Sequence, residues 1–292
     1  MIFYKFINNQ IHCICETDQL GFPIGTEILS ADYIKNIEDV SIYRSCHAIG
    51  DWAMVSAFPR LFKTKYPDKK VFIPTPALIE RMFGSMKNNW SQWNDPFKNA
   101  QLVFKNNPWV DGEFDAFEGE ILSDHYQLYN PDNLYEPIVN RILRIYHFDE
   151  SELINTLPEL YFSQEEIEEG NKIIDTLSMP YCSLILTEKH KFSDKDIKLI
   201  DIMKQYDCLY LYWSNVPIEY TPYNFIQNKI KITDLTQDVR IQLYIRSKAQ
   251  ANFGTQTGVN DIMVRYTPVY VIPHDGYNFK AGDYLKEENY II

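Results

Sequence analysis

The chain has 292 residues, which suits one large domain or two of about 150 residues each. Its 28 Lys and Arg against 40 Asp and Glu give a net charge of −12, which argues against a protein that coats nucleic acid or adheres to anionic lipid. Apolar residues make up 45% of the chain and aromatic residues 15%, so we expect a packed core rather than disorder.

The first half of the chain predicts a βαβ unit. A β-rich run at 40–46 is followed by a turn at 47–51, an amphipathic helix at 52–66 and a second strand at 70–73. Pro59 should limit the start of this helix, because proline lacks an amide hydrogen. A crossover of this kind joins parallel strands. Less regular patterns around it indicate strands at 11–15, 101–105 and 114–117 and helices at 76–83 and 134–148.

The second half of the chain repeats the alternation of strands and helices after a polar connector at 149–163. Ser163 and Glu166 fit a capping box for a helix that ends near Leu177. We expect strands at 182–186, 208–212, 251–253 and 269–272 and helices at 194–205, at 238–247 and from Thr257 onward. The two halves predict an α/β protein of two doubly wound, Rossmann-like domains, 1–155 and 156–292, that face a cleft.

The turn at Gly50 and Asp51 is the first candidate site, because ligands of such domains lie where strands end. Gly50 allows a tight turn or a close approach to a ligand. Asp51 stands where the following helix begins. Its carboxylate either caps that helix or serves as a general base for a hydroxyl nucleophile.

The turn after the strand at 251–253 is the second candidate site. Gly254 and Gly258 expose backbone amides, and Thr255 and Thr257 offer hydroxyls. Such groups suit a phosphate at the start of a helix, where the dipole favours negative charge. A glycine-rich turn without a ligand is the alternative interpretation.

The charged loop after the strand at 182–186 is the third candidate site. Lys189 and Lys191 could bind phosphate as point charges, and a solvated loop is the alternative. Asp194 and Asp196 have the spacing of a DxD metal motif, but they open a helix and should favour its N-terminus. We therefore expect no metal site.

Two stretches of the chain resemble glycosyltransferase family 9, the heptosyltransferase-like enzymes with a GT-B fold. Residues 49–73 (IGDWAMVSAFPRLFKTKYPDKKVFI) resemble the family's Gly-Asp turn, its helix with an internal proline and the strand after Tyr-Pro-Asp. Residues 253–272 (FGTQTGVNDIMVRYTPVYVI) resemble its donor-binding Thr-Gly turn and helix. The resemblance implies inverting, metal-independent transfer of a sugar from a nucleotide-sugar donor to a hydroxyl of a glycan or glycolipid acceptor, as in polysaccharide biosynthesis. The donor is a substrate, so no cofactor is implied.

On the acceptor side, Asp51 matches the family's proposed catalytic base, and Gly50 and Trp52 beside it are expected to contact substrate. The resemblance implies that Asp51 removes the proton of the acceptor hydroxyl while the hydroxyl oxygen attacks the anomeric carbon.

Lys189 or Lys191 lies in the region where the family has a phosphate-contacting lysine, and spacing does not decide between them.

On the donor side, Thr257 and Gly258, with Val259, match the family's turn whose amides hold the donor diphosphate. We expect Thr255 and Gln256, which precede this turn, to belong to the same binding site. Gln256 stands where the family commonly has Asp, and Asn260-Asp261 stands where it often has Ser-His. These departures indicate a divergent member and leave the donor nucleotide and sugar open.

Two other classes of function compete with this interpretation. An NAD-dependent oxidoreductase would also use two α/β halves, but it would need GxGxxG after the first strand, which residues 46–56 do not supply. A non-catalytic protein that binds nucleotide-sugars or glycans could retain the fold without the activity. The aromatic stretch at 88–109 could stack on a sugar or pack in the core.

The cysteines and the apolar segments favour a cytoplasmic protein. An odd number of cysteines without CxxC spacing predicts buried thiols rather than disulfides or zinc ligands. These are Cys13, Cys15, Cys46, Cys182 and Cys208. The first residues lack the apolar core of a signal peptide, and no apolar run reaches the ~18 residues of a membrane-spanning helix. We expect at most transient proximity to a membrane, through the acceptor.

We expect nucleoside diphosphates or their sugars to bind without a divalent ion, because neutral amides, hydroxyls and a lysine would replace the metal. Calorimetry with UDP-, GDP-, ADP- and dTDP-type ligands, with EDTA or with added Mg²⁺, measures this. Binding that occurs only with Mg²⁺ or Mn²⁺ would contradict the expectation.

Overall fold

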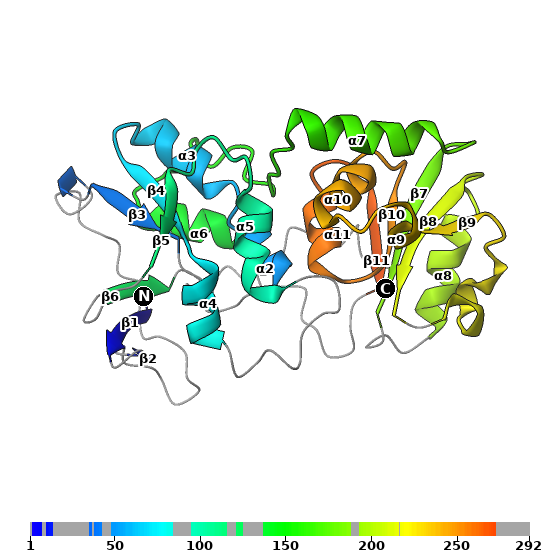
Figure 1. Cartoon of the computed structure of the whole chain (residues 1–292), viewed down its shortest axis with the longest axis horizontal. Coiled ribbons are helices and arrows are strands. Elements are labelled where there is room, and N and C mark those ends of the chain that lie inside the picture. Colours follow the sequence, from blue (N-terminus) through cyan, green and yellow to red (C-terminus); the bar gives the residue numbers. More distant parts are fainter. Residues whose placement is uncertain are drawn as a thin grey trace. The chain divides into compact units, whose positions relative to one another are not determined.

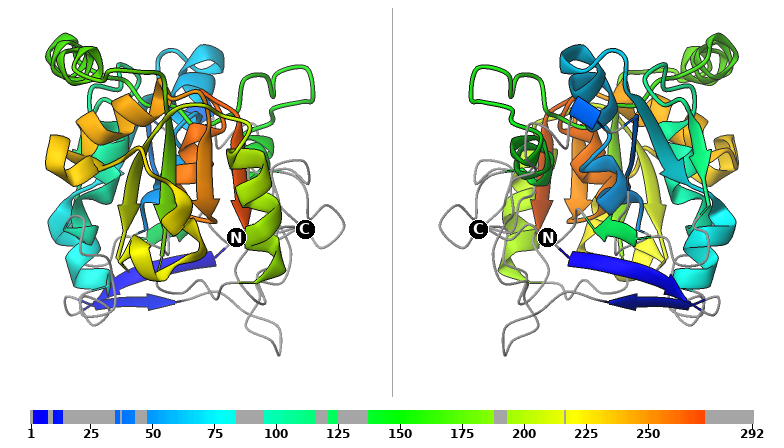
Figure 2. Two further views of the ribbon diagram at one scale, coloured as in Figure 1. Left: turned by 90° about the vertical axis from the view of Figure 1, so that its right-hand side faces the viewer. Right: turned by 90° about the vertical axis from the view of Figure 1, so that its left-hand side faces the viewer.

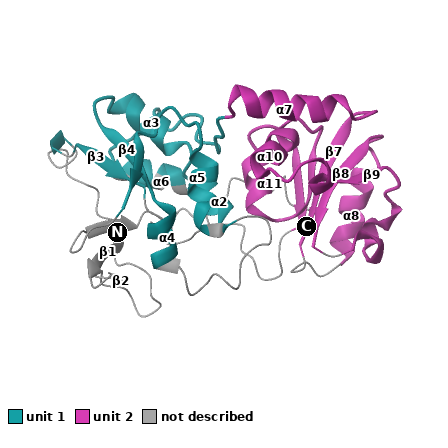
Figure 3. Cartoon of the chain, viewed as in Figure 1, with its two compact units in different colours: residues 1–161, 280–283 teal, residues 162–279, 284–292 magenta. Residues whose placement is uncertain are grey.

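The computed structural model describes residues 2–7, 10–13, 35–36, 38–42, 48–83, 95–115, 121–124, 137–187, 193–215 and 217–272. The chain divides into two compact units, and the division falls after Tyr161 (Figure 3). The sequence predicts this boundary after residue 155. The expected α/β class is confirmed, since each unit contains a sheet of parallel strands.

Unit 1 contains the predicted βαβ unit. Three strands form a parallel sheet in the order β3 (Asp39–Ser41), β4 (Lys70–Pro74) and β5 (Gly112–Phe114) (Figure 1). The parallel pairing of β3 with β4 confirms the predicted crossover. A second sheet of the same unit is antiparallel, in the order β2 (Gln10–Cys13), β1 (Ile2–Ile7) and β6 (Ile121–Asp124).

The predicted helix at 52–66 is two helices, α2 (Ile49–Ala53) and α3 (Phe58–Lys65). Pro59 lies in the first turn of α3, where its missing amide hydrogen leaves no helical bond unmade. The same residue farther inside a continuous helix would remove a bond and clash with the preceding turn. The chain therefore breaks at 54–57, and Ser56 Oγ donates to Ala53 O at 2.7 Å to close the end of α2.

The remaining helices of unit 1 confirm two predictions and correct one. Helix α4 (Pro76–Phe83) has the predicted bounds, and α6 (Ile138–Ile145) lies inside the predicted range 134–148. The strand expected at 101–105 is wrong, because a 3-10 turn (Pro96–Lys98) leads into helix α5 (Asn99–Phe104). A short apolar run does not distinguish a strand from a buried helix by itself. Ala100, Leu102, Val103 and Phe104 of α5 are all buried.

In the part of unit 2 that the structure describes, five parallel strands form a sheet in the order β11-β10-β7-β8-β9. The four predicted strands are present as β7 (Tyr181–Leu186), β8 (Leu209–Ser214), β10 (Asn252–Thr255) and β11 (Val269–Ile272). The fifth, β9 (Lys229–Lys231), was not predicted, since three residues with two lysines carry no strand signal. Two 3-10 turns, Ile218–Tyr220 and Pro222–Phe225, lie between β8 and β9. The short helix α9 (Ile232–Leu235) follows β9.

Helices cover both faces of this sheet. Cys182, Leu184 and Leu186 of β7 pack in one cluster with residues of α8 (Asp194–Met203), whereas Tyr181 packs on the other face with residues of α10 (Val239–Ser247). Figure 2 shows α8 and α10 on opposite sides of the strands. All six residues of β7 are buried, as expected for a central parallel strand.

A buried ion pair joins α7 (Gln164–Asp175) to α10. The predicted capping box is confirmed, with Glu166 Oε2 accepting from the Ser163 amide at 2.9 Å. The same carboxylate accepts from Arg240 Nε at 3.2 Å and Nη2 at 3.1 Å, and the guanidinium lies 4.7 Å from the centroid of the Phe162 ring. Both partners of this pair are buried, so removal of one would leave a buried charge unpaired. We therefore expect the pair to hold α7 against α10.

Asp194 and Asp196 belong to the start of α8, as the sequence suggested. Asp196 is fully buried, and its side chain accepts from the Ser193 amide at 2.7 Å and from the Tyr223 hydroxyl at 2.8 Å. The carboxylate thus completes a capping box and fixes the turn that carries Tyr223. Burial, followed by the charge of Asp196, raises the pKa of Tyr223 far above its usual value.

Gly170 of α7 lies against the ring of Tyr244, so we expect a substitution here to disturb the packing. A Cβ at this position would lie 2.3 Å from Cδ1 of Tyr244, whose hydroxyl donates to Asn171 Oδ1 at 2.9 Å and whose ring cannot move freely. We expect Gly170→Ala to lower the free energy of unfolding by about 1–3 kcal/mol through overpacking, although alanine favours helices. Urea denaturation measures this. The exposed neighbour Glu169→Ala should change stability by less than about 0.5 kcal/mol, and equal effects of the two variants would contradict the packing argument.

Candidate functional site

The sheet of unit 2 has a topological switch point between β7 and β10. From β7 the chain proceeds outward to β8 and β9 on one side and then returns to β10 and β11 on the other. In an open parallel sheet, the connections after two such strands leave in opposite directions and open a crevice at their carboxyl ends. Thr187 follows β7, and Thr255 ends β10, so both residues lie at this point.

Two hydroxyls meet at the switch point. Thr187 Oγ1 and Thr255 Oγ1 are 3.3 Å apart and share a hydrogen bond. Thr255 Oγ1 also donates to the Ile185 carbonyl at 3.4 Å. Thr255 is fully buried and Thr187 is half-buried, so the pair extends from the interior toward the surface. Thr187 was not among the residues we assigned to a site, and its place directly after a strand is the signal that could have identified it.

Gly254 lets β10 approach β7 closely. Its φ is +130°, a conformation that side chains disfavour, and a Cβ here would lie 1.9 Å from the Ile185 carbonyl oxygen. The sequence predicts that Gly254 exposes an amide in the turn, and this is wrong. The structure places Gly254 inside β10, where the absence of a side chain permits the strand pairing next to Thr255.

The turn after β10 is held by local hydrogen bonds. Thr257 is the N-cap of α11 (Gly258–Met263), and its Oγ1 accepts from the Asn260 amide at 3.4 Å. Asn260 Nδ2 donates to the Thr255 carbonyl at 2.8 Å, and the Gln256 amide donates to the Ile272 carbonyl at 3.1 Å. The turn is therefore fixed to both β10 and β11. Asn260 was missed as a supporting residue, although its spacing of three from a threonine cap was visible in the sequence.

The predicted donor residues lie together, with different degrees of burial. Gln256 and Val259 are buried, whereas Thr257 and Gly258 are half-buried. The first amides of a helix have no carbonyl partner within that helix. The Asn260 amide is bonded to Thr257 Oγ1, and the amides of Gly258 and Val259 also belong to this first turn of α11. Lys189 and Lys191 lie outside the described residues, which end at Thr187 and resume at Ser193.

Asp51 lies in the first turn of α2 in unit 1. It is not the N-cap that we considered, because Ala48 occupies that position and makes no side-chain cap hydrogen bond. Asp51 is half-buried. Gly50 is buried and Trp52 is fully buried in the core, a place suited to packing.

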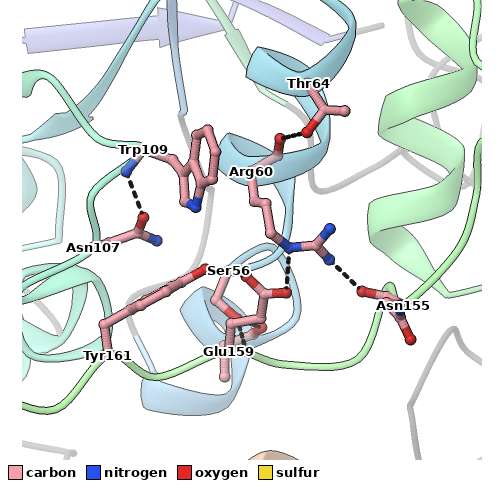
Figure 4. A network of polar contacts seen from close by, with 9 residues as sticks. Ser56, Arg60, Thr64, Asn107, Trp109, Asn155, Glu159 and Tyr161 are labelled. Carbon is pink, nitrogen blue, oxygen red and sulfur yellow. Dashed lines mark hydrogen bonds and ion pairs between the residues drawn. The ribbon is translucent and has the colours of Figure 1, made fainter.

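A polar network holds the end of α2 against the last residues of unit 1 (Figure 4). Ser56 Oγ accepts from the Glu159 amide at 2.7 Å, and Glu159 Oε1 accepts from Arg60 Nε at 2.7 Å. Arg60 Nη2 also donates to the Asn155 carbonyl at 2.6 Å. Tyr161 donates to Glu159 Oε2 at 2.8 Å, and burial together with this carboxylate raises the pKa of Tyr161 to about 12. Neither Ser56 nor Glu159 carried a signal in the sequence, because their partners are far along the chain.

Asp51 and the turn at 255–259 belong to different units, and each site is described by itself. That the two face a common cleft stays a prediction.

In the aromatic stretch at 88–109, Phe97 and Phe104 are buried in the core and Trp109 is half-buried. Trp90 and Trp93 lie outside the described residues.

Comparison with known proteins adds no relative: no protein family, no curated protein and no solved structure matches the chain. Within the described ranges, every helix is too short or too polar to cross a lipid bilayer.

Gly254→Ala should destabilise unit 2 strongly. The methyl group would overlap the Ile185 carbonyl and the residue would keep an unfavourable φ, so we expect a loss on the order of 3–5 kcal/mol. Gly112→Ala in β5 is the matched control, since its Cβ would make an ordinary 3.5 Å contact with the Phe72 ring. Guanidinium denaturation of both variants measures the difference. A small effect at Gly254 would mean that β10 does not need this close approach.

Proposed function

We propose that this protein is a glycosyltransferase that transfers a sugar from a nucleotide-sugar donor to a glycan hydroxyl, with inversion and without a metal ion. The observation that carries the proposal is the switch point of unit 2, with its threonine pair and the fixed turn at 255–259. Open parallel sheets bind ligands at such points. The resemblance of residues 49–73 and 253–272 to glycosyltransferase family 9 supports the choice of a nucleotide-sugar.

The donor diphosphate would bind at the turn after β10. The amides of Gly258 and Val259 are among the first of α11, which have no carbonyl partner within the helix, and the half-buried residues Thr187 and Thr257 lie at the same edge of the sheet. Lys189 or Lys191 would add a positive charge from the loop after β7. Preorganised donors of this kind stabilise the departing diphosphate by a few kcal/mol per contact, in place of a metal.

The acceptor hydroxyl would be activated by Asp51. The carboxylate takes the proton while the hydroxyl oxygen attacks the anomeric carbon, and the bond from that carbon to the diphosphate breaks. Attack opposite to the leaving group inverts the anomeric configuration. Ser56, tied to Glu159, fixes the end of the helix that carries Asp51 and so supports a constant position of the carboxylate.

A non-catalytic nucleotide-sugar or glycan binder is the second candidate. Gln256 favours it, because this buried residue is neutral where the resembling family commonly has an acid. A thermal-shift panel of nucleoside diphosphates and their sugars tests binding, which both candidates require. Turnover of the bound donor then distinguishes the glycosyltransferase from the non-catalytic binder.

Asp51→Asn tests the catalytic step. Asparagine keeps the size of the side chain, and loss of a carboxylate in the first turn of α2 should change stability by at most about 1 kcal/mol. Transfer should fall by roughly 10²–10⁴-fold, the usual contribution of a general base. Nucleotide affinity should stay nearly constant, because the diphosphate is proposed to bind unit 2.

The matched control is Asp68→Asn, which makes the same change on an exposed side chain in the turn before β4. This variant should have normal transfer and normal melting. Normal turnover in Asp51→Asn would overturn the proposed base. Donor binding without turnover in the unsubstituted protein, across a range of glycan acceptors, would favour the binder.

A further inference from the structure

Two free cysteines are neighbours in the sheet of unit 2, at the amino ends of its strands. Cys182 is the second residue of β7, and it pairs in register with Tyr210 of β8. Cys208 directly precedes β8 and lies two residues before Tyr210. Since side chains alternate along a strand, Cys208 shares a face with Tyr210 and therefore with Cys182. Both cysteines belong to the same core cluster under α8 and form no disulfide.

The two thiols differ in acidity. Their interaction within the cluster lowers the pKa of Cys208 and, together with burial, raises the pKa of Cys182. Nucleophilic sulfur chemistry proceeds through the thiolate, so Cys208 is the thiol prepared to react first.

Cys208 also lies closer to solvent. It lines an open pocket between the end of α8 and the segment before β9, together with Tyr206, Asp207 and Asn228. Cys182 is fully buried, whereas Cys208 retains 6% of its surface. A small, uncharged oxidant that enters this pocket would reach the wall that Cys208 helps to form, and Cys182 lies on the same face of the neighbouring strand.

We propose that Cys208 and Cys182 form a reversible two-thiol oxidation site for hydroperoxides, in which Cys208 is the reacting thiol and Cys182 the resolving thiol. The Cys208 thiolate attacks one peroxide oxygen, the O–O bond breaks, and a sulfenic acid and water form. The Cys182 sulfur then attacks the sulfenic sulfur, the S–O bond breaks, and the hydroxyl leaves with a proton as the second water. Two thiols lose two electrons in total, and one hydrogen peroxide becomes two waters.

This site is separate from the proposed sugar transfer. Cys182 lies near the amino end of β7, and Thr187 follows the carboxyl end of the same strand. The disulfide would join β7 to β8 at the end of the sheet away from the switch point. A transient disulfide of this kind is the form in which disulfides occur in reducing compartments.

The test treats the full-length folded protein with hydrogen peroxide, blocks remaining thiols with iodoacetamide and maps the products by mass spectrometry. We expect a cross-link between the Cys182 and Cys208 peptides, lighter by two hydrogen atoms and removed by dithiothreitol. In Cys182→Ala, the cross-link should be lost and dimedone should label Cys208 as the trapped sulfenic acid. In Cys208→Ala, the cross-link should be lost and dimedone should not label Cys182.

A triple variant, Cys13→Ser with Cys15→Ser and Cys46→Ser, is the matched control and should form the same cross-link at the same rate. Circular dichroism establishes that each variant is folded before treatment. Inert thiols in the folded protein would overturn the proposal, as would a cross-link that forms only after unfolding in urea. Preferred dimedone labelling of Cys182 in Cys208→Ala would overturn the assigned order of reaction.

Discussion

The close approach of β10 to β7 is the constraint on which the candidate donor site depends. At Gly254 the two backbones are so near that a side chain would overlap the Ile185 carbonyl. This approach brings Thr255 beside Thr187, and the hydrogen bonds from Gln256 to Ile272 and from Asn260 to Thr255 then direct the chain into α11. The residues at the switch point are thus positioned by the close strand pairing and by the hydrogen bonds of the turn that follows.

The helix of Asp51 is positioned by side chains that are distant in sequence. Ser56 joins the end of α2 to Glu159, and Arg60 holds Glu159 and Asn155. The last segment of unit 1 therefore stabilises the break between α2 and α3. Because a buried carboxylate requires partners, the pairing of Glu159 with Arg60 and Tyr161 is a condition for this arrangement.

The two ends of β7 have different chemistry. Near its amino end, Cys182 shares an apolar cluster with Cys208, where soft sulfur atoms pack easily. Beyond its carboxyl end, Thr187 offers a hydroxyl at the edge of the sheet. The central position of the strand, buried on both faces, allows one sheet to support a candidate ligand site and a pair of thiols without contact between them.

The sequence by itself determined the elements whose signals are local. The capping box at Ser163 and Glu166, the helix at 76–83 and the strand at 269–272 agree with the structure, because caps, proline and short-range periodicity act within a few residues. It also located the turn at 255–259, although it gave Gly254 the wrong role. Only the tertiary structure decided that 99–104 is a helix, that β9 completes the sheet and that β7 and β10 are neighbours. It also decided the second role of Glu166, the pairing with Arg240. Each of these depends on contacts between residues far apart in the chain, for which a single sequence carries no signal.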